Sequence, residues 1–288
     1  MSRFTASLLV LLAAALWGTG FYFQKTVMDH LGPLQFLGFR GLLASVALAP
    51  FALRESRLNT TPLRAAFPLV IVGGLVFFTA GVLQQNGLFT ATVTNTGFLT
   101  ALYVVITPLL LWALMGQKPS AKLWVAVLLA SCGIWALGGG STSAFSKGDM
   151  LIALSAIFWS LYMVITTKAA PHAKPMQITC LVFVVLAILG WSSALALEDI
   201  NWQSIKAAAP SILYVGLLAS AVCYAIIASA VRYISATHAS ILLSTETLFS
   251  ATAGHVFLGE RMGAIGWVGA ALLLTAVVMV QWKAKAPT

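Results

Sequence analysis

Charged residues are scarce in this chain. Of its 288 residues only 8% are Asp, Glu, Lys or Arg. A soluble globular domain carries about 25% charged residues, so this chain cannot cover a water-facing surface with them. Apolar residues make up 60% of the sequence, and the mean hydropathy is +0.96. These values predict an integral membrane protein whose main partner is the lipid bilayer.

Cysteine is also rare. Cys132, Cys180 and Cys223 each lie inside an apolar run, without a CxxC pattern or a histidine at ligand spacing. We interpret them as small buried side chains, so neither a disulfide framework nor a metal site is expected. The sequence also lacks HExxH, P-loop and Gly-x-Ser-x-Gly motifs, and no apolar run holds two carboxylates. We therefore expect neither an enzyme nor a cofactor.

Long apolar runs fill the chain instead. A transmembrane helix needs about 20 predominantly apolar residues, and short connectors with Gly, Pro, Asn and Ser separate ten such segments. The segments are residues 5–24, 34–53, 66–88, 94–115, 122–140, 149–167, 176–197, 210–230, 236–258 and 264–282. The connectors leave no room for a soluble domain. The expected fold is therefore all-α, with ten transmembrane helices.

The basic residues indicate how the helices are oriented. The chain has a net charge of +9, but its Lys and Arg residues are spread between the apolar runs and do not cluster with aromatics, which argues against nucleic-acid binding. If the N-terminus is cytoplasmic, most Lys and Arg residues fall on the inner side, as the positive-inside rule requires. Both termini are thus predicted to be cytoplasmic. The expected location is the inner (plasma) membrane, as a multi-pass protein.

Two stretches of the chain resemble each other at a distance of 142 residues. "AALWGTGFYFQK" (14–25) and "AIFWSLYMVITTK" (156–168) both carry a Trp followed by a small residue. Further on, "TNTGFL" (94–99) aligns with "THASIL" (237–242), and "GQK" (116–118) aligns with "GER" (259–261), each at an offset of 143. A constant offset predicts two repeats, residues 1–143 and 147–288. Because each holds five helices, an odd number, the second repeat is predicted to be inverted in the membrane.

An inverted repeat typically encloses a site between its halves near the middle of the membrane. If the two halves exchange open and closed states, the opening moves from one face to the other. Alternating access is therefore the mechanism that this topology favours. A single chain of ten helices is sufficient to enclose such a pathway, so a monomer suffices.

Polar and aromatic residues at membrane depth are the candidates for that site, because buried polar groups in lipid usually face the protein interior. They concentrate in spans one, three, four, six, eight and nine. The candidate substrate-binding residues are Trp17, Gly18, Gln84, Gln85, Asn95, Tyr103, Trp159, Tyr162, Tyr224, His238, Ser244 and Glu246. For Trp17 and Trp159, tight helix packing is the competing interpretation.

Two ionisable residues lie within spans and lack a counterpart in the other repeat. Val182 stands opposite Arg40, and Tyr103 stands opposite Glu246. One interpretation is structural: Arg40 extends toward the outer interface, and Glu246 is hydrogen-bonded within the bundle. The other is that they form a charge pair, or that one of them binds substrate charge or a coupling proton.

Several short motifs resemble the drug/metabolite transporter superfamily, specifically its ten-helix EamA branch. They are "LWGTGF" (16–21), "FR" (39–40), "LLSTET" (242–247) and "LGERM" (258–262). The resemblance implies ten helices in two inverted halves and export of small metabolites; the chain looks most like bacterial exporters of amino acids, including aromatic ones. Two departures are clear: Thr247 replaces the Pro that usually follows the Glu of span nine, and Gln117 replaces a carboxylate.

Together these observations predict a secondary transporter that exports amino acids or similar small metabolites across the cytoplasmic membrane. Two alternatives stay open. One is a multidrug or organic-cation exporter, which would need Glu246 to be accessible and to titrate. The other is a membrane receptor or assembly subunit that transports nothing.

Overall fold

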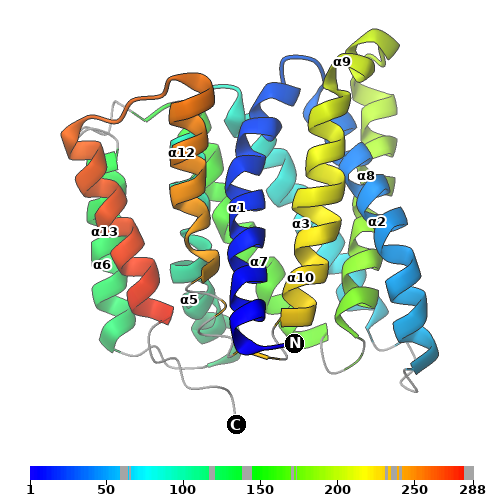
Figure 1. Cartoon of the computed structure of the whole chain (residues 1–288), viewed down its shortest axis with the longest axis horizontal. Coiled ribbons are helices and arrows are strands. Elements are labelled where there is room, and N and C mark those ends of the chain that lie inside the picture. Colours follow the sequence, from blue (N-terminus) through cyan, green and yellow to red (C-terminus); the bar gives the residue numbers. More distant parts are fainter. Residues whose placement is uncertain are drawn as a thin grey trace.

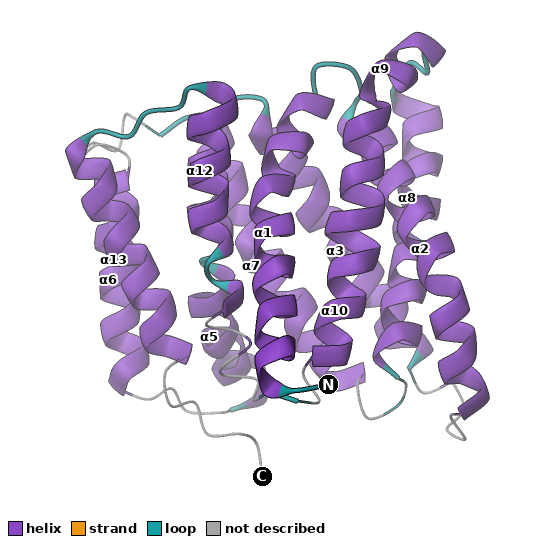
Figure 2. Cartoon of the chain, viewed as in Figure 1, coloured by secondary structure: helices purple, strands orange, loops and turns teal. Residues whose placement is uncertain are grey.

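The computed structural model describes residues 1–58, 64, 66–116, 121–137, 145–169, 172, 174–230, 233–234, 239 and 242–281. Within these ranges every element is a helix, and the helices stand side by side with their loops at the two ends (Figures 1 and 2). The helices are α1 (Arg3–Val27), α2 (Pro33–Leu58), α3 (Phe67–Leu88), α4 (Val93–Thr100), α5 (Tyr103–Met115), α6 (Ala121–Leu137), α7 (Lys147–Ala169), α8 (Pro175–Leu197), α9 (Trp202–Leu213), the π-helix η3 (Tyr214–Val222), α10 (Cys223–Ala230), α12 (Glu246–Leu258) and α13 (Ala264–Gln281).

Seven segments of the described chain are long and apolar enough to cross a membrane. They are Arg3–Val27, Pro33–Arg57, Phe67–Leu88, Val93–Leu114, Lys147–Ala169, Pro175–Leu197 and Trp202–Ala230. Two shorter apolar helices cover Ala121–Leu137 and Ala264–Met279, and α12 has 13 residues. The protein is therefore a multi-pass membrane protein, while the count of ten spans stays a prediction.

One span begins earlier than expected. The sequence places its start at residue 210, but the helix begins at Trp202 and continues through Pro210. The Asn201 side chain accepts hydrogen bonds from the backbone N–H groups of Gln203 and Ser204, which are otherwise unpaired in the first turn. This cap allows the helix to extend beyond the apolar stretch on which the expectation depended.

Two closely packed pairs of helices lie at opposite edges of the bundle. α6 and α13 form one pair, and α2 and α8 form the other (Figure 1). Small residues allow the close approach: a Cβ atom added to Gly190 of α8 would collide with the backbone of Gly38 in α2. In lipid, helix association depends on such van der Waals contact, since the hydrophobic effect does not act between helices there.

Carboxylates cap the first turns of helices from other parts of the chain. The backbone N–H groups of Leu34 and Gln35, at the start of α2, donate to Glu198, with N···O distances of 2.9 and 2.8 Å. Met176 and Gln177, at the start of α8, donate in the same way to Glu55, at 2.9 and 3.3 Å. A carboxylate satisfies unpaired N–H groups and interacts favourably with the positive end of the helix dipole. Each of these two helices thus caps the other.

The start of α4 is capped similarly by Glu260, which lies in the loop before α13. Its carboxylate accepts from the N–H groups of Val93 and Thr94 and from the Thr94 hydroxyl, at 2.7, 2.9 and 2.7 Å. Near it, Lys25 at the end of α1 donates to the carbonyls of Leu88 and Ala91, at 2.9 and 2.7 Å. These bonds tie several helices together at the end of the bundle where α1 finishes.

The first helices of the two halves run in opposite directions. The last turn of α1 contacts the end of α3 through Lys25 and Leu88. The first turn of α7 lies at that same end of α3, because Gly148 donates to the Thr90 hydroxyl at 2.9 Å. α1 therefore ends where α7 begins. α1 begins and α13 finishes at the opposite end of the bundle (Figure 1).

Candidate functional site: a polar cavity at two interrupted helices

Two helices are interrupted inside the bundle at equivalent positions. The helix that starts at Val93 stops at Thr100, and a new helix, α5, begins at Tyr103. In the second half, Ser244 and Thr245 form a turn, and α12 begins at Glu246. Tyr103 and Glu246 differ by the repeat offset of 143. Interrupted helices at corresponding places in two halves are the feature of transporters that most often marks a binding site.

A third irregular segment supplies anchors for two of the candidate residues. The π-helix η3 is wider than an α-helix, and such segments are frequent at functional sites. Its Ala219 carbonyl accepts a hydrogen bond from Trp17 Nε1 at 2.6 Å. The next residue, Ser220, accepts from Arg40 Nε at 2.9 Å. Consecutive residues of η3 thus hold the side chains that α1 and α2 project inward.

These segments surround a cavity of about 80 Å³. It is lined by Trp17, Phe21, Gln24, Arg40, Gln84, Thr100, Tyr103, Trp159, Met163, Ala219, Tyr224 and Glu246. Seven of these residues are candidates from the sequence: Trp17, Arg40, Gln84, Tyr103, Trp159, Tyr224 and Glu246. The structure brings them together from α1, α2, α3, α5, α7, α10 and α12.

Phe77 of α3 organises the aromatic wall of the cavity. It is fully buried and makes edge-to-face contacts with Trp159, Tyr162 and Phe183, with ring centroids 4.8, 5.1 and 5.4 Å apart. The guanidinium of Arg40 lies 5.3 Å from the centre of the same ring. A cation over an aromatic face is attracted by the ring's negative potential. Phe77 therefore helps to hold a positive charge inside the bundle.

The two charged residues of the cavity are buried but do not pair with each other. Arg40 is 7% exposed and Glu246 is 4% exposed. Within the described part of the chain no ion pair joins them, and the carboxyl of Glu246 has no hydrogen-bond partner. Tyr224 lies near both, and Tyr103 lies near Glu246. The cavity thus offers a basic and an acidic side chain that do not contact each other.

The two repeat-related tryptophans differ in one respect. The indole N–H of Trp17 is satisfied by Ala219, whereas that of Trp159 is buried without a partner. The side-chain oxygen of Gln24 is also buried and unpartnered. An unsatisfied buried polar group costs about 1–3 kcal/mol. Both side chains belong to residues that line the cavity.

Five of the remaining candidates lie outside the cavity wall. Gly18 lies where α1 crosses α12, and an added Cβ would stand 2.6 Å from the Phe249 Cβ and collide with the Glu246 carbonyl. Gln85 is buried and donates to the carbonyl of Gln24 at 3.3 Å. Asn95 donates to Asp149 at 3.0 Å.

The other three candidates are Tyr162, Ser244 and His238. Tyr162 supports the wall by packing edge to face against Phe77, with ring centroids 5.1 Å apart. Ser244 is buried in the turn before α12, where its carbonyl accepts from the Thr247 hydroxyl at 3.0 Å. His238 is outside the described residues.

Sequence reasoning missed Gln24, Phe21 and Phe77. Phe21 and Gln24 follow Trp17 by four and seven residues, which places all three on one helical face. That spacing is a signal that could have identified them. Phe77 carries no such signal, since it is one apolar residue within an apolar run.

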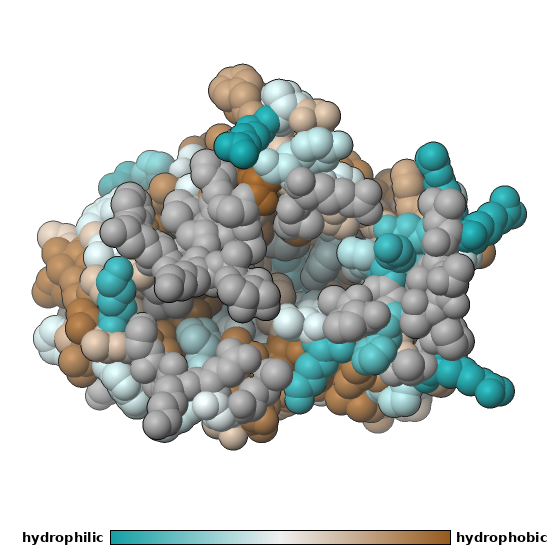
Figure 3. Space-filling view, turned by 90° about the horizontal axis from the view of Figure 1, so that it is seen from below, coloured by the Kyte–Doolittle hydropathy of each residue, from teal (hydrophilic) through white to brown (hydrophobic). Residues whose placement is uncertain are grey.

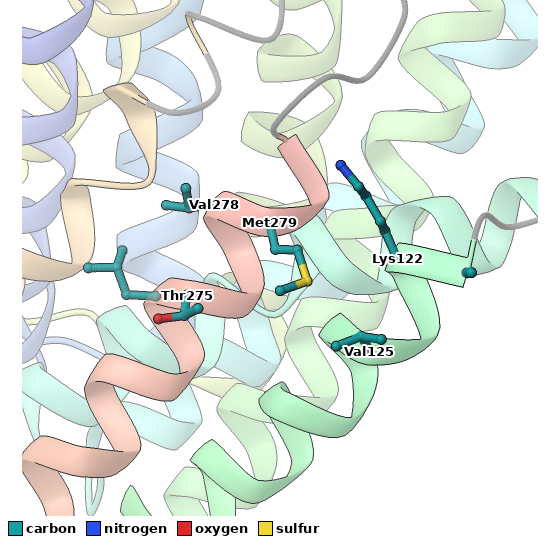
Figure 4. Close-up of a pocket in the computed structure, with 7 residues that line it drawn as sticks. Lys122, Val125, Thr275, Val278 and Met279 are labelled. Carbon is teal, nitrogen blue, oxygen red and sulfur yellow. The ribbon is translucent and has the colours of Figure 1, made fainter.

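A larger hollow of about 780 Å³ lies between α6 and α13 at one edge of the bundle (Figure 4). Its walls are mostly apolar, with Lys122 and Thr275 as the polar members. None of the candidate site residues reaches it, so we assign it to the lipid-facing surface. Across the described residues, no group of three or more His, Cys, Asp or Glu side chains is placed to hold a metal ion.

A multi-pass helical bundle with an internal polar cavity at interrupted helices is the architecture of a membrane transporter. The profile of the EamA-like transporter family matches the chain twice, over residues 4–139 and 146–282. The chain therefore belongs to this family of the drug/metabolite transporter superfamily and is built from two EamA repeats. The resemblance to the EamA branch inferred from the short motifs is confirmed, and the finer match to amino-acid exporters stays a prediction.

Proteins of similar sequence are named as transporters, which agrees with this assignment. The uncharacterized transporter YwfM of Bacillus subtilis is 29% identical, covering 95% of this chain and 93% of the relative. An uncharacterized transporter of Archaeoglobus fulgidus is 25% identical (98% and 88% covered), and an S-adenosylmethionine/S-adenosylhomocysteine transporter of Chlamydia muridarum is 23% identical (88% and 85%). A solved crystal structure shares the fold, with a TM-score of 0.69, 16% identity and 96% of both chains covered.

Proposed function

We propose that this transporter exports amino acids or similar small metabolites across the cytoplasmic membrane by alternating access. The cavity carries the proposal. Arg40 and Glu246 line the same cavity beside both helix interruptions and do not pair with each other. Charged side chains are costly at membrane depth and are usually retained there for transport or coupling. All lining residues come from one chain, so a monomer is sufficient.

The two ends of the bundle support an alternating mechanism. At the end where α1 finishes, Glu260, Glu198 and Lys25 tie helix termini together. From the opposite end, the molecule is hollowed near its centre, with pale and teal residues inside (Figure 3). α1 and α7 run in opposite directions. The part of the first repeat at the tied end of the bundle therefore corresponds to the part of the second repeat at the hollowed end. An exchange of these two arrangements would move the opening across the membrane.

The size of the cavity favours a small substrate. A cavity of about 80 Å³ holds a few water molecules, whereas pockets for drug-sized ligands span about 300–1,000 Å³. S-adenosylmethionine, which a relative is named for, carries an amino-acid group joined to a nucleoside and would need the cavity to expand. An amino acid needs a smaller expansion. The aromatic walls suit an apolar side chain.

Counterflow in proteoliposomes tests the proposal. The purified protein is reconstituted with an unlabelled solute inside, and uptake of the labelled solute is measured for amino acids, S-adenosylmethionine and cationic dyes. Saturable uptake of one or more amino acids is the expected result. Uptake of dyes alone would indicate an organic-cation exporter. No saturable uptake of any solute would indicate a receptor or assembly subunit and would refute the proposal.

A further inference from the structure

The wall of the central cavity contains donors and acceptors that the protein leaves without partners. Arg40 uses one of its five N–H groups, to Ser220, and Trp159 uses none. On the accepting side, the carboxyl of Glu246 and the side-chain oxygen of Gln24 are unpartnered. All four of these cavity-lining residues belong to the described chain. A ligand that satisfied them would need to accept from two and donate to two.

The two donors are gathered around one ring. The guanidinium of Arg40 lies 5.3 Å from the centre of Phe77, and the Trp159 ring lies 4.8 Å from it, edge to face. Both donors also line the cavity, so they define a donor subsite at this ring. A carboxylate fits such a subsite, because it accepts several hydrogen bonds, and bonds to a guanidinium are among the strongest in proteins.

The acceptors come from another pair of helices. Glu246 is the first residue of α12, and Gln24 lies on α1, which crosses α12 at Gly18. A carboxylate and an amide oxygen together suit an ammonium group, which has three donors and no acceptor. No ion pair links Arg40 to Glu246, so both side chains are available to a ligand.

We propose that the cavity recognises a zwitterion by its two ends: Arg40 and Trp159 bind the carboxylate, and Glu246 and Gln24 bind the ammonium. This inference rests on the proposed function and assigns the side chains that recognise the substrate. A simple organic cation leaves Arg40 and Trp159 unsatisfied beside a like charge. A simple anion does the same to Glu246 and Gln24. A free amino acid, or a metabolite with both groups, satisfies all four residues.

Ligand binding to the purified transporter in detergent tests this assignment without requiring transport. The probes are L-leucine, L-leucinamide, which lacks the carboxylate, and N-acetyl-L-leucine, which lacks the ammonium. The same three forms of phenylalanine provide a second series. Affinity is measured from the concentration dependence of the thermal unfolding midpoint. The wild-type protein is expected to prefer the free amino acid to both derivatives.

Two variants test the carboxylate subsite. Trp159→Phe removes one N–H donor and keeps a ring, and Arg40→Lys keeps the charge and removes the planar donor set. Each is expected to lower the preference for leucine over leucinamide about tenfold, the effect of one hydrogen bond to a charged group. The preference for leucine over N-acetylleucine stays unchanged. If Arg40→Lys does not fold, Trp159→Phe still decides the outcome.

The ammonium subsite gives the opposite pattern. Glu246→Gln and Gln24→Leu are expected to lower the preference for leucine over N-acetylleucine about tenfold and to leave the comparison with leucinamide unchanged. Trp17→Phe is the matched control, because its N–H is bonded to Ala219 and not free for a ligand. It is expected to change the affinity of all three probes by the same factor.

Three results would overturn the assignment: no binding by either free amino acid, equal binding of a derivative and its parent, or variants that weaken every probe to the same extent. Failure of the proposed function has a different signature. A protein that binds leucine with this crossed pattern but shows no counterflow would retain the assignment and lose the transport proposal.

Discussion

The two halves of this transporter agree at the starts of α2 and α8 and differ in the cavity. Glu55 caps the start of α8, and Glu198 caps the start of α2, at equivalent positions 143 residues apart. In the cavity, by contrast, Tyr103 of one half corresponds to the charged Glu246 of the other. The comparison teaches that the duplicated scaffold is maintained by similar contacts, whereas the two charged residues of the cavity lie where the copies have diverged.

The largest expected effect comes from removing the charge at the diverged pair. Under proton coupling, Glu246→Gln is expected to abolish accumulation driven by a pH gradient while exchange down a concentration gradient continues, since only the carboxyl can carry a proton. Tyr103→Phe, its counterpart, is expected to change substrate affinity but to keep the dependence on the gradient. Both are measured in proteoliposomes with and without an imposed pH gradient. Unchanged gradient dependence in Glu246→Gln would exclude this residue as the coupling site.

A second contrast concerns the residue after each tryptophan. Gly18→Ala is expected to destabilise the protein by about 1–3 kcal/mol, because the added Cβ collides with the backbone of α12. Ser160→Gly, at the equivalent position, removes a hydrogen bond to the Tyr103 carbonyl (3.0 Å) and is expected to cost about 1 kcal/mol. Unfolding in detergent measures both. A Gly18→Ala protein as stable as the wild type would show that α1 and α12 are not in close contact.

The reciprocal caps of α2 and α8 should respond alike. Glu55→Ala and Glu198→Ala each leave two N–H groups of a first turn without their carboxylate and are each expected to cost about 1–2 kcal/mol. Because the sites lie at opposite ends of the helix pair, the double variant is expected to show the sum. Thermal unfolding of the three variants checks this. A large effect from one residue and none from the other would show that the two ends are not equivalent.

The smallest effect is expected at Glu260, whose equivalent in the first half is Gln117. Glu260→Gln keeps one acceptor oxygen but removes the charge that caps α4, at a cost of about 1 kcal/mol. The end of the bundle where α1 finishes should therefore open more often. A single cysteine at buried Ala91, in a background without the native cysteines, is expected to react about fivefold faster with a thiol reagent. An unchanged rate would show that Glu260 does not help to keep this end of the bundle closed.

Much of the cavity was predictable because polar side chains within a membrane span usually face the protein interior. Arg40, Glu246 and Gln84 were identified by polarity within an apolar span, and Tyr103 was recognised as the counterpart of Glu246. Gln24 was also accessible from its helical spacing to Trp17. The candidates that lie elsewhere, such as Asn95, satisfy the same criterion with local partners, Asp149 in this case. Polarity and depth cannot separate these two uses.

Other features depended on contacts between distant segments. Nothing in residues 214–222 predicts a π-helix, yet its carbonyl and hydroxyl groups hold Trp17 and Arg40. Phe77 is one of many apolar residues, and its place at the centre of the aromatic wall follows from how α3 meets α7 and α8.

The order of residues alone determined the membrane setting, the duplication and the family, because hydropathy, offset and motif spacing are properties of the linear chain. The tertiary structure alone decided which polar groups have partners. Trp17 and Trp159 carry the same indole, but only the first meets a carbonyl oxygen, that of Ala219, about two hundred residues away. Hydrogen bonding acts over a few ångströms, so a free donor is defined by its neighbours in space and not by its neighbours in sequence.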